Sequence, residues 1–186
     1  MRANRKGSLP PPELEFNDSR LIRFYRGLEK DPAGRMIEDI WQMTTPELER
    51  NHDYIQWLFP LPQRSNYSPG APVLTQQDID SFIRDENLRE RVLISYGLML
   101  RFYGLEQRQL HGQPVLVPAA DFAQRAAEWL QPGNHNYLRI SRILNFLMLV
   151  QMKAEARILF SALEELNLLH HKKVGSAFSY WRAAVT

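Results

Sequence analysis

Histidine is the side chain in this sequence that offers general-base chemistry or nitrogen ligation near neutral pH. The chain has no cysteine, which excludes thiol catalysis, thiolate metal sites and a disulfide framework. No histidine has the spacing of a His-x-x-x-His or Glu-x-x-His zinc motif, and no nucleotide-binding loop is present, so the sequence predicts no metal and no cofactor. The five histidines are His52, His111, His135, His170 and His171.

Two of these histidines lie in similar polar clusters, Asn51-His52-Asp53 and Asn134-His135-Asn136, each at the expected start of a helix. In one interpretation the side chains cap these helices and hydrogen-bond within the fold. In the other, the clusters converge, and two imidazoles with two helix N-termini form an aromatic pocket whose polar floor favours an anion. The residues expected to contact the ligand are then His52, Asp53, Gln56, Trp57, His135, Asn136, Arg139 and Arg142.

Arg139 and Arg142 stand about one helical turn apart, so the expected helix places both guanidiniums on one face. Like charges at this spacing disfavour an isolated helix, and their presence together predicts an acidic partner. Inside the fold the candidate is Asp53. Outside it, the candidate is the carboxylate of a peptide or a phosphate, which a guanidinium can bind with two hydrogen bonds. Surface pairing with an acid such as Glu128 is the alternative.

Trp57 is interpreted either as a wall of the pocket or as an anchor of the core. Tyr54 and Leu58 share its face of a short amphipathic helix, at the spacing typical of a buried stripe. We therefore favour the core for Trp57.

Three classes of function fit these residues. A catalytic hypothesis uses His52 as a base oriented by Asp53, but the sequence has no Gly-x-Ser-x-Gly nucleophile elbow. A nucleic-acid accessory protein would use Arg20, Arg23 and Arg26, although a net charge of +2 is not a basic footprint. A binding module requires only an aromatic wall and a few polar groups. We therefore expect a non-enzymatic module that binds a short peptide or a small anionic ligand.

Length and composition set the class of protein. A chain of 186 residues suits one domain with a single core. The absence of cysteine is compatible with a reducing compartment, and we expect a cytoplasmic location. No apolar run approaches the roughly 18 residues that a membrane span requires, so no span is predicted. The oligomeric state is left open.

The helices that position the two clusters follow from apolar periodicity, caps and breaks. Residues 1–17 contain Leu9-Pro10-Pro11-Pro12 and are expected to be a disordered proline-rich lead, followed by one helical domain over residues 18–186. Asp85 begins a long helix, the expected central post of the core, and Gly104 ends it. Other expected helix starts are Asp18 or Ser19, the residues before Met36, Thr44-Thr45-Pro46, Asp53, Thr75, the residues after Pro118, Asn134, Lys153 and Ser176.

Residues 105–118 contain Val115-Leu116-Val117, which has strand character but no evident partner, so we interpret the whole segment as a loop. Seven or more helical segments without a convincing strand pair are typical of a helical bundle. The predicted fold is therefore all-α, an irregular single-domain bundle of about seven to nine helices.

Five sequence motifs resemble the conserved region of the opioid growth factor receptor family. The longest runs from Asn51 to Leu61 and reads NHDYIQWLFPL; the others lie at residues 71–75, 99–104, 135–144 and, more weakly, 176–181. The resemblance covers roughly residues 20–186. It implies a folded module from a family whose animal members are described as receptors for the pentapeptide Met-enkephalin that restrain proliferation from the nuclear region. The resemblance carries over no catalytic or ligand-contact residues.

Overall fold

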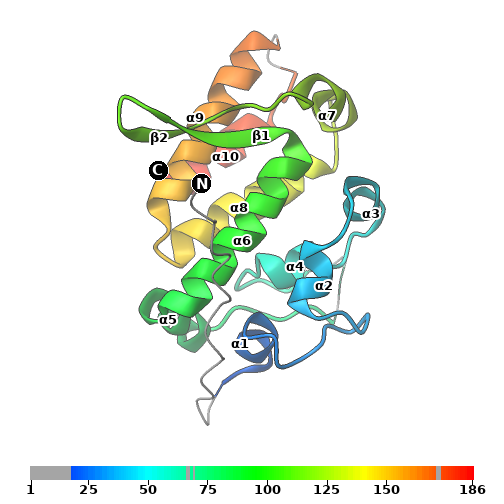
Figure 1. Ribbon diagram of the computed structural model, residues 1–186, viewed down its shortest axis with the longest axis vertical. Helices are drawn as coiled ribbons and strands as arrows, with labels where there is room; N and C mark the ends of the chain where they lie inside the picture. Colours follow the sequence, from blue (N-terminus) through cyan, green and yellow to red (C-terminus); the bar gives the residue numbers. More distant parts are fainter. Residues whose placement is uncertain (1–17, 66–67, 69, 171–172) are drawn as a thin grey trace, which may run out of the picture.

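The computed structural model describes residues 18–65, 68, 70–170 and 173–186 (Figure 1). These residues form ten α-helices and one β-hairpin. The predicted proline-rich lead and His171 lie outside these residues. The fold is mainly helical, as predicted, but the helices outnumber the predicted seven to nine and the hairpin makes the fold not purely all-α. The helices are α1 (Arg20–Tyr25), α2 (Ile37–Trp41), α3 (Thr45–Arg50), α4 (Ile55–Leu58), α5 (Gln76–Arg84), α6 (Glu86–Tyr103), α7 (Phe122–Trp129), α8 (Asn136–Leu149), α9 (Lys153–Leu169) and α10 (Ala177–Val185), and the strands are β1 (Leu105–Leu110) and β2 (Gln113–Pro118).

Side-chain caps begin several helices where the sequence indicates them. The Ser19 hydroxyl accepts a hydrogen bond from the Ile22 amide and starts α1. Thr75 and Asp78 form a capping box at the start of α5, and the Asp85 carboxylate accepts from the first amides of α6. These oxygens satisfy backbone N–H groups that every helix start leaves without intrahelical partners. The start of each of these helices is therefore encoded by residues next to it in the chain.

Helix α6 is the central post of the core, as predicted. It crosses the middle of the view in Figure 1 and packs against α2, α5, α7 and β1. It ends at Gly104, whose φ of +73° is a left-handed conformation that favours glycine. Although α6 has 18 residues, no helix in the described part of the chain is long and apolar enough to cross a membrane. The buried stripe of α6 includes Leu88, Val92, Tyr96, Met99 and Tyr103.

The interpretation of residues 105–118 as a loop was wrong, because this segment forms an antiparallel hairpin. Leu105 pairs with Pro118 and Leu110 with Gln113. The two turn residues, His111 and Gly112, have φ values of +50° and +78°, and left-handed pairs of this kind join twisted strands with a two-residue turn. The apolar strand β2 pairs with the polar strand β1. Most side chains of β1 are exposed, and its sequence lacks the alternation of apolar and polar residues that indicates a strand.

Helices α8, α9 and α10 pack against one another, and α8 supplies one wall of the candidate site. The Trp181 indole of α10 donates to the Tyr137 carbonyl oxygen at 3.1 Å, which ties α10 to the start of α8. The opposite wall is the segment of residues 50–65, which contains α4. It is anchored to α8 where the Phe59 ring meets the Phe146 ring edge-to-face, with centroids 5.8 Å apart. Two segments distant in sequence therefore face each other across the site.

Candidate functional site

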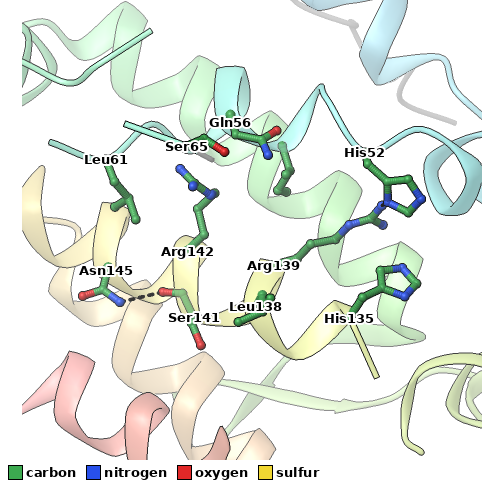
Figure 2. Close-up of a pocket in the computed structure, with 11 residues that line it drawn as sticks. His52, Gln56, Leu61, Ser65, His135, Leu138, Arg139, Ser141, Arg142 and Asn145 are labelled. Carbon is green, nitrogen blue, oxygen red and sulfur yellow. Dashed lines mark hydrogen bonds between the residues drawn. The ribbon is translucent and has the colours of Figure 1, made fainter. Parts of the chain in front are cut away.

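The two Asn-His clusters come together in space. The rings of His52 and His135 are edge-to-face, with centroids 5.2 Å apart. His52 lies between α3 and α4, whereas His135 precedes the first residue of α8. Figure 2 shows the two imidazoles at one end of a pocket, with the Arg139 side chain reaching toward His52.

Arg139 is the structural link between the clusters. Its side chain is 5 % exposed, and its guanidinium donates to the carbonyl oxygens of Leu48 at 3.1 Å and Asn51 at 2.9 Å. The last carbonyl groups of a helix have no intrahelical partner, so Arg139 caps the C-terminal end of α3. It also donates to the Asn136 side-chain oxygen at 3.1 Å, and it lies 3.0 Å from the Nδ1 atom of His52. A guanidinium cannot accept a hydrogen bond, so His52 Nδ1 is the acceptor and a neutral ring carries its proton on Nε2.

Glu49 is a site residue that sequence reasoning missed. One carboxylate oxygen lies 3.1 Å from His135 Nε2. The other accepts a hydrogen bond from the side-chain nitrogen of Asn136 at 3.1 Å and lies 3.8 Å from the Arg139 guanidinium. Glu49 thus binds three residues at the start of α8. In the sequence it is one of two acids on a short helix, and nothing near it in the chain indicates these distant partners.

The predicted pairing of Asp53 with Arg139 was wrong. The Asp53 carboxylate instead forms an ion pair with Arg35 at 2.9 Å, and Arg35 also binds Asp31 at 2.6 Å. Asp53 does not cap α4 either, because the residue before that helix is Tyr54 and no side chain caps it. The orienting contact on His52 comes from Arg139 rather than from Asp53, so the His52–Asp53 pair of the catalytic hypothesis is not formed.

Trp57 belongs to the core rather than to the pocket wall. Its side chain is buried, and its ring packs against Phe24 with centroids 5.0 Å apart. The guanidinium of Arg20 covers another part of the ring at 5.2 Å from its centroid. Gln56, next to it in the chain, is also buried. In the amide orientation that gives its oxygen and nitrogen suitable partners, the Gln56 side-chain nitrogen donates to the carbonyl oxygens of His52 and Asp53. These hydrogen bonds stabilise the bend before α4.

The pocket itself has a volume of about 400 Å³ and lies between α8 and the segment of residues 50–65. Most of its surface is apolar, and Leu138 at its edge is 64 % exposed. Five of the eight predicted ligand-contact residues line it: His52, Gln56, His135, Arg139 and Arg142. The remaining three, Asp53, Trp57 and Asn136, do not. The sequence did not indicate the other lining residues, which are Ile55, Leu61, Ser65, Leu138, Ser141 and Asn145.

Arg142 is the arginine of the pocket with fewer hydrogen-bond partners among the described residues. Within that part of the chain its guanidinium makes one hydrogen bond, to the Phe59 carbonyl oxygen at 3.3 Å. No carboxylate of the described residues forms an ion pair with it. Burial lowers the pKa of Arg142 because it disfavours the charged form. A guanidinium has five N–H donors. In Figure 2 its side chain extends from α8 toward Gln56 and Ser65.

His135 is held toward its neutral form. Burial lowers the pKa of His135, and the nearby Arg139 and His52 lower it further, whereas Glu49 opposes them. A neutral imidazole can serve as a metal ligand, but no group of three or more His, Cys, Asp or Glu side chains in the described part of the chain is placed to hold a metal ion.

The arginines of α1 and its C-cap form ion pairs within the protein. Arg20 and Arg23 form ion pairs with Glu29 at 2.9 Å and 3.1 Å. Arg26 is buried and forms ion pairs with Asp18 and Asp85, both at 2.8 Å. The three arginines therefore have carboxylate partners, which lowers their value as phosphate-binding groups in the nucleic-acid hypothesis.

Comparison with known proteins identifies the family. The opioid growth factor receptor (OGFr) conserved region matches residues 15–186. The chain is 38% identical over 136 residues to opioid growth factor receptor-like protein 1 of Xenopus tropicalis, covering 70% of this chain and 26% of that protein. It is 37% identical over 162 residues to the opioid growth factor receptor of Rattus norvegicus, covering 83% of this chain and 27% of that protein. No solved structure matches.

The chain belongs to the opioid growth factor receptor family. The resemblance found in the motifs is thereby confirmed. The chain spans about a quarter of the length of these two relatives, at 26% and 27%.

Proposed function

We propose that this member of the family is a non-enzymatic binding module that holds a short peptide or a small anionic ligand in the pocket between α8 and residues 50–65. The observation that carries this proposal is the state of Arg142, a half-buried guanidinium with one backbone hydrogen bond and no carboxylate partner among the described residues. A charge removed from water is unfavourable until a counterion and hydrogen bonds compensate it. A carboxylate or phosphate oxygen would supply both.

The two arginines of α8 have different roles in this proposal. Arg139 is occupied by the carbonyl oxygens of Leu48 and Asn51 and maintains the wall of the pocket. Arg142, one turn further along α8, keeps donors available for a ligand. The imidazoles of His52 and His135 flank the same pocket and add polar contacts. A wall held by internal hydrogen bonds is formed before the ligand arrives, which reduces the ordering cost of binding.

The names of the relatives agree with a binding role, because they call those proteins receptors or receptor-like. A receptor role for this chain is part of the proposal. The apolar surface beside Arg142, to which Ile55, Leu61 and Leu138 contribute, suits a ligand with an apolar portion next to its anionic group.

Isothermal titration calorimetry tests this proposal with inorganic phosphate, N-acetyl-alanine and N-acetyl-alanine amide. We expect the two anions to bind and the neutral amide to bind at least tenfold more weakly. Arg142→Gln should weaken binding of the anions by at least tenfold, whereas Arg157→Gln, on the exposed surface of α9, should leave it unchanged. Equal affinities for wild type and Arg142→Gln, or no binding of either anion, would contradict the proposal.

A salt series on the same binding reaction separates pocket binding from contact with nucleic-acid phosphates. Binding of a polyanion through many phosphates weakens steeply with salt concentration, whereas a single carboxylate in an apolar pocket has a shallow dependence. We expect the shallow dependence for N-acetyl-alanine and no tighter binding of a single-stranded oligonucleotide at physiological salt.

A further inference from the structure

A second groove adjoins the pocket along α8. It lies between α8 and α10, has a volume of about 500 Å³, and is lined by Tyr180 and Ala183 among others. Leu138, Ser141 and Asn145 line both hollows. The pocket and the groove therefore meet at the ridge that these three side chains form.

The groove, like the pocket, has a mostly apolar surface. Leu138 on the ridge is 64 % exposed, and Tyr180 at the edge of the groove is 69 % exposed. Large apolar side chains that border a hollow lose contact with water when an apolar ligand covers them, and this burial favours binding. The two hollows thus form one largely apolar path, and Arg142 lies on the pocket side of it.

The polar side chains of the ridge direct hydrogen bonds to their own helix. The Ser141 hydroxyl donates to the Tyr137 carbonyl oxygen at 3.0 Å, and the Asn145 side-chain nitrogen donates to the Ser141 carbonyl oxygen at 2.8 Å (Figure 2). Ser141 then has no donor left, and Asn145 keeps one of its two N–H groups. A ligand rich in carbonyl groups would lose water on this ridge without equal replacement. A hydrocarbon chain has no polar group to satisfy, so the ridge suits it better.

We propose that the ligand is an alkyl carboxylate, a fatty acid whose carboxylate binds Arg142 and whose hydrocarbon chain crosses the ridge into the α8–α10 groove. This inference rests on the proposed function and names its ligand class. Charge complementarity places the carboxylate at Arg142, which has no ion-pair partner among the described residues. The planar guanidinium can bind both carboxylate oxygens.

The width of α8 sets the chain length that reaches the groove. A helix with its side chains is roughly 10 Å across. An extended polypeptide advances about 3.3–3.6 Å for every three backbone bonds, and an extended alkyl chain advances on the same scale. A chain of about nine carbon atoms is therefore needed to join the carboxylate at Arg142 to the groove beyond Leu138. Hexanoate reaches Arg142 but not the groove, whereas dodecanoate spans both.

Isothermal titration calorimetry on the full chain compares hexanoate with dodecanoate, at concentrations below those at which dodecanoate forms micelles. Each buried methylene group strengthens binding by roughly fourfold. We expect dodecanoate to bind at least tenfold more tightly than hexanoate, which requires cover for about two of its additional methylene groups. Dodecyltrimethylammonium has the same chain with a cationic head group, and it should bind at least tenfold more weakly than dodecanoate.

Variants of the groove locate the hydrocarbon chain. Ala183→Trp places a large ring in the groove from an exposed position of α10 and should abolish the gain of dodecanoate without changing hexanoate binding. Tyr180→Ser removes exposed apolar surface and should reduce the gain in the same way. The matched control is Ala154→Trp, at an exposed position of α9 that lines a different hollow, and it should leave the gain unchanged.

The outcomes separate this inference from the proposed function. If hexanoate and dodecanoate bind equally, or if the gain survives both Ala183→Trp and Tyr180→Ser, the fatty-acid inference is overturned and the proposed function stands on its binding of N-acetyl-alanine. If dodecyltrimethylammonium or the peptide acetyl-Leu-Ala-Ala binds as tightly as dodecanoate, the choice of an alkyl carboxylate is overturned. If Arg142→Gln changes the affinity of neither hexanoate nor N-acetyl-alanine, both proposals fail.

Discussion

The guanidinium of Arg139 donates to the carbonyl oxygen of Asn51 at 2.9 Å and thereby joins the first turn of α8 to the segment that follows α3. The same guanidinium lies 5.5 Å from the Tyr54 ring centroid and 5.8 Å from that of Phe102. A planar cation near two aromatic rings, with hydrogen bonds to backbone carbonyls, is held by directional contacts that an ammonium group cannot reproduce. Arg139 is thus a structural residue that shapes the pocket from inside.

We predict that Arg139→Lys destabilises the protein by about 2–4 kcal/mol, because the lysine retains the charge but lacks the planar fork that donates to the carbonyl oxygens of Leu48 and Asn51 together. Chemical denaturation followed by circular dichroism measures the loss. The matched control is Arg142→Lys, one turn further along α8, which gives up a single backbone hydrogen bond and should cost less than about 1 kcal/mol. Equal losses for the two variants would mean that the Arg139 contacts contribute nothing specific.

We predict that His135 makes stability decrease as the solution is acidified. The pKa of His135 is lowered in the folded protein from the ordinary value of 6.5, so between the two pKa values the unfolded chain binds more protons. The contribution of the neutral His135 ring to the free energy of unfolding is complete above pH 6.5 and is lost as the pH falls through the folded-state pKa. Melting temperatures of wild type and His135→Gln between about pH 8 and 5 test this. The difference in melting temperature between wild type and the variant should narrow or reverse as the pH falls. A difference in melting temperature that does not change with pH would contradict the prediction.

We predict that Gly104→Ala is more damaging than Gly112→Ala, although both glycines have left-handed backbones, with φ of +73° and +78°. At Gly104 an added Cβ would lie 2.9 Å from the Cβ and Cγ atoms of Arg125 and 3.0 Å from the Phe122 Cα, whereas nothing lies within 4 Å of one at Gly112. The conformational cost of about 1–2 kcal/mol is common to both, and overpacking adds about 1–3 kcal/mol at Gly104 alone. Thermal melts compare the two variants directly. Similar melting temperatures would show that α7 moves aside at little cost.

We predict that Trp57→Ala lowers the free energy of unfolding by about 3–5 kcal/mol, because it leaves a cavity beside Phe24 in the core. Tyr180→Ala is the aromatic control on the exposed surface and should change stability by less than about 0.5 kcal/mol. Urea denaturation curves measure both. A Trp57→Ala protein of nearly wild-type stability would place the ring at the pocket surface after all.

Local chemistry accounts for what could be predicted of the helices. Ser19, Thr75 and Asp85 begin helices α1, α5 and α6, and Gly104 ends α6, because caps and left-handed glycines act on backbone groups within a few residues. The polar strand β1 was not predicted. Its identity as a strand depends on pairing with β2, and its own side chains are exposed.

The candidate site divides in the same way. The residue types and the helix face of α8 pointed to His135, Arg139 and Arg142 in one place, and motif similarity indicated the family. The contacts of Glu49 with His135 and of Asp53 with Arg35 were not predicted. A carboxylate can pair with any cation that the folded chain brings near it, and proximity between distant segments is not encoded in local spacing.

The sequence by itself thus determined the helical class, most helix starts, the family and the candidate cations, since each of these depends on neighbours within a few positions or on matching motifs. The tertiary structure alone decided that Arg139 supports the wall while Arg142 keeps donors available in the pocket. The two side chains are one turn apart on the same helix and carry the same charge. They differ in what lies opposite them. For Arg139 it is the carbonyl-rich end of α3, and for Arg142 it is a mostly apolar hollow in which the Phe59 carbonyl oxygen is its hydrogen-bond partner among the described residues.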